Sequence, residues 1–187
     1  MRRPHFITGV PLLIAALFVA LFGILPAAHA ADRASVDNLQ ASVRTLGFRE
    51  SLPKEGSIVV GVIYASDTRD GEALAAETAA LLSTMRGPNS RRLQPQVLSI
   101  NGLAHFKGHL DVLFLVQGAT KHSDVLLDAM RRRHLVTISD DSLCSIAQTC
   151  VLMVRAGQRV EISLNTSLAD AVDARFSLVF MMVVNRK

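Results

Sequence analysis

The sequence predicts a single α/β domain, with a mostly parallel sheet, flanking helices and a C-terminal antiparallel hairpin. Between residues 33 and 139, apolar runs rich in β-branched residues alternate with amphipathic segments of helical period. Two segments of alternating polarity then flank a glycine-containing turn, the usual pattern of a hairpin. We find no internal repeat and no low-complexity segment.

The N-terminus has the three parts of a secretory signal. Arg2 and Arg3 precede the apolar run 7–25, and small residues at Ala28 and Ala30 form a cleavage site. We expect residues 1–30 to be a signal peptide and residues 31–187 to be the mature domain, exported to the periplasm. The alternative is an uncleaved anchor, because 19 apolar residues approach the length that spans a bilayer. Both alternatives place the domain outside the cytoplasm.

Removal of the predicted signal changes the composition of the chain. The whole chain has a net charge of +4, but the signal takes two arginines and leaves 18 basic residues against 16 acidic ones. A net charge of +2, with no basic stripe carrying interleaved aromatic residues, argues against nucleic acid as a partner. The 157 residues of the mature chain suffice for one domain with its own core.

The elements of the first two-thirds follow from periodicity. A helix over residues 33–47 presents Val36, Leu39, Val43 and Leu46 on one face, with Gly47 as its end. Further helices are expected over residues 72–85 and 121–133. Apolar runs predict buried strands over residues 57–64 and 111–117. Residues 94–100 and 134–139 are two further strand candidates. Residues 101–108 are short and irregular, with room for one helical turn.

The last third begins with a loop at residues 140–142. Strands over 150–155 and 159–164 form the hairpin, with Val160, Ile162 and Leu164 on one face of the second strand. Asn165 or Thr166 can cap a following helix. The apolar segment 176–184 fits a strand or a helix equally well.

The two cysteines, Cys144 and Cys150, both lie in the exported part of the chain. An even number of cysteines in an oxidising compartment favours a disulfide, which would stabilise the fold by roughly 2 kcal/mol for so short a loop. A metal pair or a reactive thiol is the alternative, although no further cysteine or paired histidine completes a zinc set.

Candidate catalytic groups follow two of the predicted strands. Asp67 and Asp70 come after the first strand, and Asp140 and Asp141 after the fourth, where open α/β sheets bind ligands. Ordinary turn formation and helix capping is the favoured explanation for all four carboxylates. Ser66 and Ser142 stand nearby, but no Gly-x-Ser-x-Gly elbow accompanies them. We therefore assign no catalytic residue and do not expect an enzyme.

Five other groups are candidate sites. His105 and His109 have the spacing of a helical metal pair, but Gly108 disfavours a helix and surface histidines are the simpler interpretation. Arg131–His134 could meet an anion or an acidic surface, and it also complements a helix dipole. Met181–Val184 suits an adaptable interface, although core filling is favoured. Tyr64 is expected to pack in the core, and residues 118–121 lack the spacing of a phosphate loop. No cofactor or metal is expected.

The C-terminal third carries an ordered set of residues, namely Val160, Ile162, Asn165, Ala169, Phe176 and Ser177. This set resembles the end of YfiR-type periplasmic proteins. In that family a strand closes in Asn, a helix with small residues follows, and an aromatic or aliphatic residue plus Ser opens the last apolar segment. Upstream, residues 46–50 and 136–139 are also similar, so the resemblance covers nearly all of residues 36–184. The chain departs from the family at Asp173, where Gly is usual, and over residues 143–149, although some members have a cysteine pair near this location.

The resemblance implies regulation by contact. Well-understood members of the family inhibit an inner-membrane diguanylate cyclase by binding its periplasmic domain, which lowers cyclic di-GMP and restrains biofilm formation. Their disulfide supports the fold and links activity to the redox state of the envelope, a role that carries over to Cys144 and Cys150 only. The contact residues do not transfer, a homodimer is an alternative assembly, and a small solute-binding or transporter-accessory module is the alternative function.

Overall fold

The computed structural model describes residues 35–186, so the predicted signal peptide of residues 1–30 lies outside the described residues. Its helices are α1 Val36–Thr45, α2 Gly71–Thr84, α3 Ile100–His105, α4 Ser123–Arg133, α5 Ser142–Ile146, α6 Thr166–Ala171 and α7 Leu178–Val183. Its strands are β1 Ile58–Tyr64, β2 Leu93–Ser99, β3 Val112–Leu115, β4 Val136–Ser139, β5 Leu152–Ala156, β6 Val160–Leu164 and β7 Asn185–Arg186.

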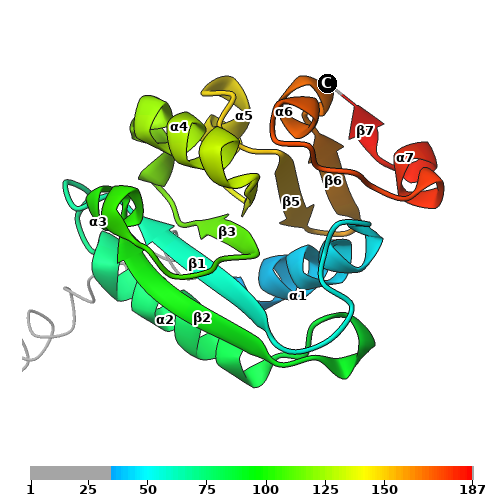
Figure 1. The fold of residues 1–187 in the computed structure, drawn as a ribbon, viewed down its shortest axis with the longest axis horizontal. Helices are drawn as coiled ribbons and strands as arrows, with labels where there is room; N and C mark the ends of the chain where they lie inside the picture. Colours follow the sequence, from blue (N-terminus) through cyan, green and yellow to red (C-terminus); the bar gives the residue numbers. More distant parts are fainter. Residues whose placement is uncertain (1–34, 187) are drawn as a thin grey trace, which may run out of the picture. The chain divides into compact units, whose positions relative to one another are not determined.

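The strands of the described residues form one sheet in the order β2-β1-β3-β4-β5-β6-β7 (Figure 1). The first five strands in this order are parallel neighbours, β5 and β6 form an antiparallel hairpin, and β7 adds a short parallel edge. The predicted fold class, a mostly parallel α/β sheet with a C-terminal hairpin, is confirmed. The apolar segment of residues 176–184, ambiguous in sequence, forms α7.

Helices cover both faces of the parallel strands. The helix α2 packs against β1 and β2, α3 packs against α4, and α1 packs against β5. Along the sheet, the chain steps from β1 to β2 in one direction, and from β2 to β3 and β3 to β4 in the opposite direction. Because such crossovers are right-handed, α2 lies on one face of the sheet and α3 and α4 lie on the other. Every residue of β3 and β4 is therefore buried, whereas β2 lies at the edge of the sheet and tolerates Pro95.

Hydrogen bonds between two charged side chains and the backbone hold the amino ends of these strands. The Arg49 guanidinium donates to the carbonyl oxygens of Asp111 and His134, and the Asp111 carboxylate accepts from the Val59 amide at 2.7 Å. Burial lowers the pKa of the Arg49 guanidinium from its ordinary value, and the nearby Asp111 carboxylate partly opposes this effect. The Arg49 backbone also forms a β-bridge with Phe176, so the same residue ties the C-terminal segment to the strands.

Details at the element ends differ from the sequence prediction. Gly47 does not stop the first helix, which continues as a 3₁₀ turn at Leu46–Phe48, and Val36 is exposed because it lies in the first turn of α1. In the hairpin, Leu164 is buried but Val160 is exposed beside the turn. The predicted loop at 140–142 is also shorter, because α5 begins at Ser142.

Asp173 adopts the conformation that glycine would adopt. Its φ is +52°, and the amides of Asp173 and Ala174 donate to the carbonyls of Asp170 and Ala169 at 3.1 and 2.8 Å. These are the two hydrogen bonds of a Schellman motif, which ends a helix in a left-handed residue, usually Gly. The chain therefore differs from the family pattern in the side chain at this position, but it keeps the left-handed turn that glycine favours.

We predict that Asp173→Gly raises the free energy of unfolding by about 0.5 kcal/mol. The variant removes the cost of a side chain in the left-handed conformation, and this gain outweighs the loss caused by the greater freedom of glycine in the unfolded chain. Asp170→Gly, a matched change inside α6, should lower the stability by a similar amount. Urea denaturation of both variants measures the two effects. A loss of stability in Asp173→Gly would contradict the argument.

Candidate functional site

The C-terminal helix α7 is anchored by aromatic side chains. The Ser177 hydroxyl accepts a hydrogen bond from the Phe180 amide and caps the helix. Phe180 is fully buried, and its ring stacks on Phe48 and Phe176 with centroids 5.0 and 5.3 Å apart. One side of α7 is thereby fixed to the N-terminal 3₁₀ turn and to its own preceding segment.

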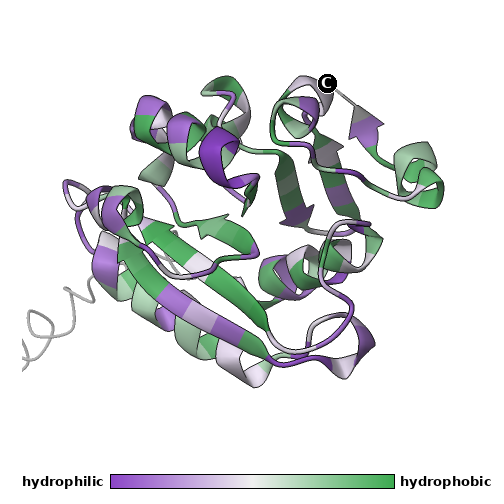
Figure 2. Ribbon diagram, viewed as in Figure 1, coloured by the Kyte–Doolittle hydropathy of each residue, from purple (hydrophilic) through white to green (hydrophobic). Residues whose placement is uncertain are grey.

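The opposite side of α7 carries four large apolar side chains exposed to solvent. Leu178, Val179, Met182 and Val183 are 81, 66, 82 and 74% exposed, and we call this set the α7 face. They form two pairs four residues apart, which lie next to each other on a helix. No charged residue occurs between Phe176 and Val184. Figure 2 shows the ribbon of α7 in the hydrophobic colour, whereas the ribbon of α4 alternates between hydrophilic and hydrophobic colours.

The prediction that Met181–Val184 fills the core is wrong for half of this segment. Val184 is buried and Met181 is partly buried, whereas Met182 and Val183 face solvent. The physical reason is that this helix of six residues packs on the aromatic cluster through Phe180 and leaves its opposite side in solvent. A contiguous exposed apolar surface marks an interaction site more often than scattered apolar residues do.

A pocket of about 440 Å³ lies at the carboxyl ends of the parallel strands. It is lined by residues that follow β1, by the first turns of α2, by residues that follow β3 and by α5, namely Thr68, Arg69, Asp70, Gly71, Ala73, Leu74, Glu77, Gln117, Gly118, Lys121 and Leu143. We call this the strand-end pocket. Its size falls within the range of small-molecule sites.

The four carboxylates predicted to follow strands do not assemble into an acid–base pair. Asp67 lies 3.1 Å from His122 Nε2, and this hydrogen bond is the main reason why the pKa of Asp67 is below its ordinary value. Asp140 accepts from the Asn38 amide group at 2.7 Å, and Asp141 caps α5 by accepting from the Leu143 amide at 2.9 Å. Asp70 borders the strand-end pocket at the start of α2. Asp141 therefore has the capping role expected from its residue type, whereas Asp67 and Asp140 bond side chains that are distant in the sequence.

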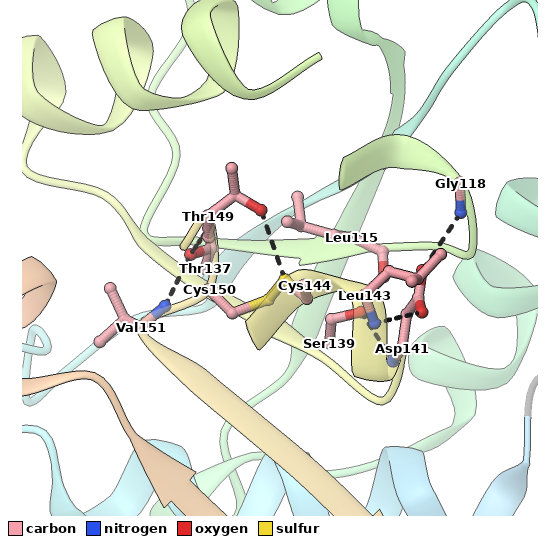
Figure 3. Close-up of a disulfide and its surroundings, with 10 residues drawn as sticks. All are labelled: Leu115, Gly118, Thr137, Ser139, Asp141, Leu143, Cys144, Thr149, Cys150 and Val151. Atoms are coloured by element: carbon pink, nitrogen blue, oxygen red, sulfur yellow. Dashed lines mark hydrogen bonds between the residues drawn. A yellow bond between two sulfur atoms is a disulfide. The ribbon is translucent and has the colours of Figure 1, made fainter. Parts of the chain in front are cut away.

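The disulfide braces the segment between β4 and β5 (Figure 3). Cys144 in α5 and Cys150 before β5 are joined, with Cα atoms 5.5 Å apart, which fits the pairing expected from the sequence. The buried Thr137 hydroxyl donates to the Thr149 carbonyl at 2.7 Å and accepts from the Val151 amide at 3.0 Å. One hydroxyl on β4 thus holds both sides of the second cysteine.

The basic and histidine clusters are divided among structural contacts. Arg132 pairs with Asp128, and Arg133 donates to the carbonyls of Phe106 and Gly108 while its guanidinium lies 5.7 Å from the Phe106 ring. His109 Nε2 lies 2.9 Å from Asp111 Oδ1, whereas His105 is exposed at the end of α3. Over residues 35–186, no three side chains of metal-ligating type gather into one cluster.

Fold and surface together define a small, disulfide-braced α/β domain that exposes the apolar α7 face. The chain belongs to the YfiR/HmsC-like family, whose model matches residues 32–182. Membership indicates a periplasmic regulator of cyclic di-GMP signalling, in a family that regulates rather than catalyses. The comparison with curated proteins finds no match. In the described part of the chain, no helix is both long and apolar enough to cross a membrane.

Sequence reasoning missed the contacts made by Arg49 and Thr137, because each joins elements far apart along the chain. Their residue types gave no local signal. The exposure of the α7 face did have a signal, an uninterrupted apolar run at the end of the domain. That run alone does not tell a buried helix from one that presents half of its surface.

We predict that Thr137→Val lowers the free energy of unfolding by about 1–3 kcal/mol, because it leaves a buried carbonyl and a buried amide without a partner while preserving the side-chain volume. The matched change Thr84→Val, at an exposed helix end, should stay within about 0.5 kcal/mol of the wild type. Urea denaturation under oxidising conditions compares the two. Equal stability of both variants would show that the Thr137 hydroxyl does not hold the cysteine segment.

Proposed function

We propose that this protein is a periplasmic inhibitor of an inner-membrane diguanylate cyclase, and that it acts by binding the periplasmic sensor domain of that enzyme through the α7 face. The family supports the signalling context, and the sequence resemblance supports the cyclase as the partner. Under this proposal, release of the contact raises cyclic di-GMP.

The observation that carries the proposal is the exposure of four large apolar side chains on a single short helix. Complete burial of such a side chain is worth about 1.5–3 kcal/mol. The sum over the four side chains is comparable to the free-energy cost of bringing two proteins together. The α7 face can therefore act as the energetic centre of an interface, with polar surface around it.

The chemistry of the α7 face fits contact rather than catalysis. Between Phe176 and Val184 the chain has no acid, base or cysteine, so the face offers no nucleophile and no proton-transfer group beyond the capping Ser177. Met182 adds a flexible side chain that can adjust to a partner surface. A partner with an apolar groove or pocket is the complement that this surface requires.

The position of α7 also suits a rigid contact. Stacking of Phe180 between Phe48 and Phe176 fixes one side of the helix, so the exposed side chains start from a set orientation. A surface that is already ordered loses less entropy on binding. We therefore expect little backbone change in α7 between the free and bound protein.

The test is the double variant Leu178→Asp/Met182→Asp, compared with Val160→Asp. Val160 is also an exposed apolar residue, but it is the first residue of β6, beside the hairpin turn, and is not part of α7. We expect the double variant to keep the wild-type free energy of unfolding, to lose at least tenfold in affinity for the purified periplasmic domain of the cyclase, and to raise cyclic di-GMP in cells to the level of the deletion strain. Val160→Asp should behave as the wild type.

Two results would overturn parts of the proposal separately. Normal binding and inhibition by the double variant would show that another surface makes the contact. An unchanged cyclic di-GMP level and unchanged surface attachment after deletion of the whole protein would refute the regulatory function itself.

A further inference from the structure

The strand-end pocket occupies the position at which open α/β sheets bind ligands. From β1 the chain runs through α2 to β2 on one side, whereas β3 lies on the other side of β1. The loops that leave the carboxyl ends of β1 and β3 therefore diverge, which opens a crevice between them. Thr68 to Gly71 after β1 and Gln117 to Lys121 after β3 both contribute to the lining of the pocket.

The pocket combines an apolar wall with charged groups. Ala73 and Leu74 of α2 and Leu143 of α5 provide apolar lining, and Leu143 is half exposed even though its neighbour Cys144 is fully buried. Arg69 and Lys121 bring two cations from the two diverging loops. Among residues 35–186, neither cation lies within ion-pair distance of an acidic side chain, although the charge of Lys121 contributes to the lowered pKa of Asp67.

The start of α2 adds to the positive character of the pocket. Asp70 precedes the helix in a left-handed conformation, with φ +60°, and its side chain caps no amide of the first turn. The N-terminus of a helix of 14 residues carries a partial positive charge and open amide donors. Asp70 and Glu77 also border the pocket, so preference for an anion depends on Arg69 and Lys121 acting together with this helix end.

A buried hydroxyl at the pocket wall has no partner. Thr68 Oγ1 is inaccessible and makes no hydrogen bond within the described part of the protein. Thr68 packs against Gly118, where a Cβ atom would lie 2.7 Å from this oxygen and where φ is +82°. This oxygen is inaccessible and faces Gly118, so Thr68 marks the place where the two loops that line the pocket pack against each other.

We propose that the strand-end pocket binds a small organic anion with an apolar body. Arg69 and Lys121 hold the anionic group near the start of α2, and the apolar body packs on Ala73, Leu74 and Leu143. The site is separate from the α7 face, so ligand binding is a property of this protein that the proposed contact with a cyclase does not require.

Three probes with the same apolar ring test the charge preference. Phenylacetate, phenylacetamide and phenethylamine are titrated into the purified mature chain, and amide shifts are followed by nuclear magnetic resonance. We expect phenylacetate to shift the amides of Gly71, Gly118 and Leu143, with an affinity at least tenfold higher than that of the neutral and cationic probes. Absence of shifts at these amides, or equal or tighter binding of the amine, would overturn the proposal.

Variants locate the site without touching the core. Lys121→Gln should weaken phenylacetate binding about tenfold, while Lys54→Gln, an exposed lysine in the loop before β1, should leave it unchanged. Ala73→Trp, at an exposed position in α2, should block all three probes by filling the pocket. Unfolding curves check that the variants remain folded. Wild-type affinity in both Lys121→Gln and Ala73→Trp would place the binding elsewhere and refute the proposed site.

Discussion

The hydroxyl of Thr137 makes the junction on which the C-terminal half of this domain depends. At this point the sheet stops adding parallel strands through helices and turns into an antiparallel hairpin. Only two residue pairs join β4 to β5, so the backbone ladder between them is short. The Thr137 hydroxyl adds two buried hydrogen bonds at this place, one to each side of Cys150. Such bonds are costly to lose, because the groups left behind would be buried without partners.

The disulfide and the Thr137 contacts act on the same short segment from different directions. The disulfide joins α5 to the residue before β5. It stabilises the fold mainly by reducing the conformational entropy of the unfolded chain. The hydroxyl fixes the orientation of the segment in the folded state. Since Leu143 precedes Cys144 in α5 and lines the strand-end pocket, the same brace holds one wall of that pocket.

The two candidate surfaces have different physical origins. The strand-end pocket follows from topology, because neighbouring crossovers in opposite directions open a crevice at the carboxyl ends of β1 and β3. The α7 face follows from a shortage of packing partners, because the aromatic stack of Phe48, Phe176 and Phe180 covers one side of a short apolar helix and leaves the other side in water. A ligand pocket and a protein-binding surface can therefore coexist on one small domain.

The sequence by itself determined the fold class, the order of the elements, the hairpin and the family resemblance. These features depend on local periodicity and turn chemistry, as in the run of residues 57–64 or the glycine turn at 157. The capping role of Asp141 could also be anticipated from its residue type. Only the tertiary structure decided that Met182 and Val183 face solvent, that Arg49 links β3, β4 and the C-terminal segment, and that Arg69 and Lys121 border one pocket. Those outcomes depend on contacts between residues far apart in the chain, and a local pattern carries no information about which distant partner will cover a given side chain.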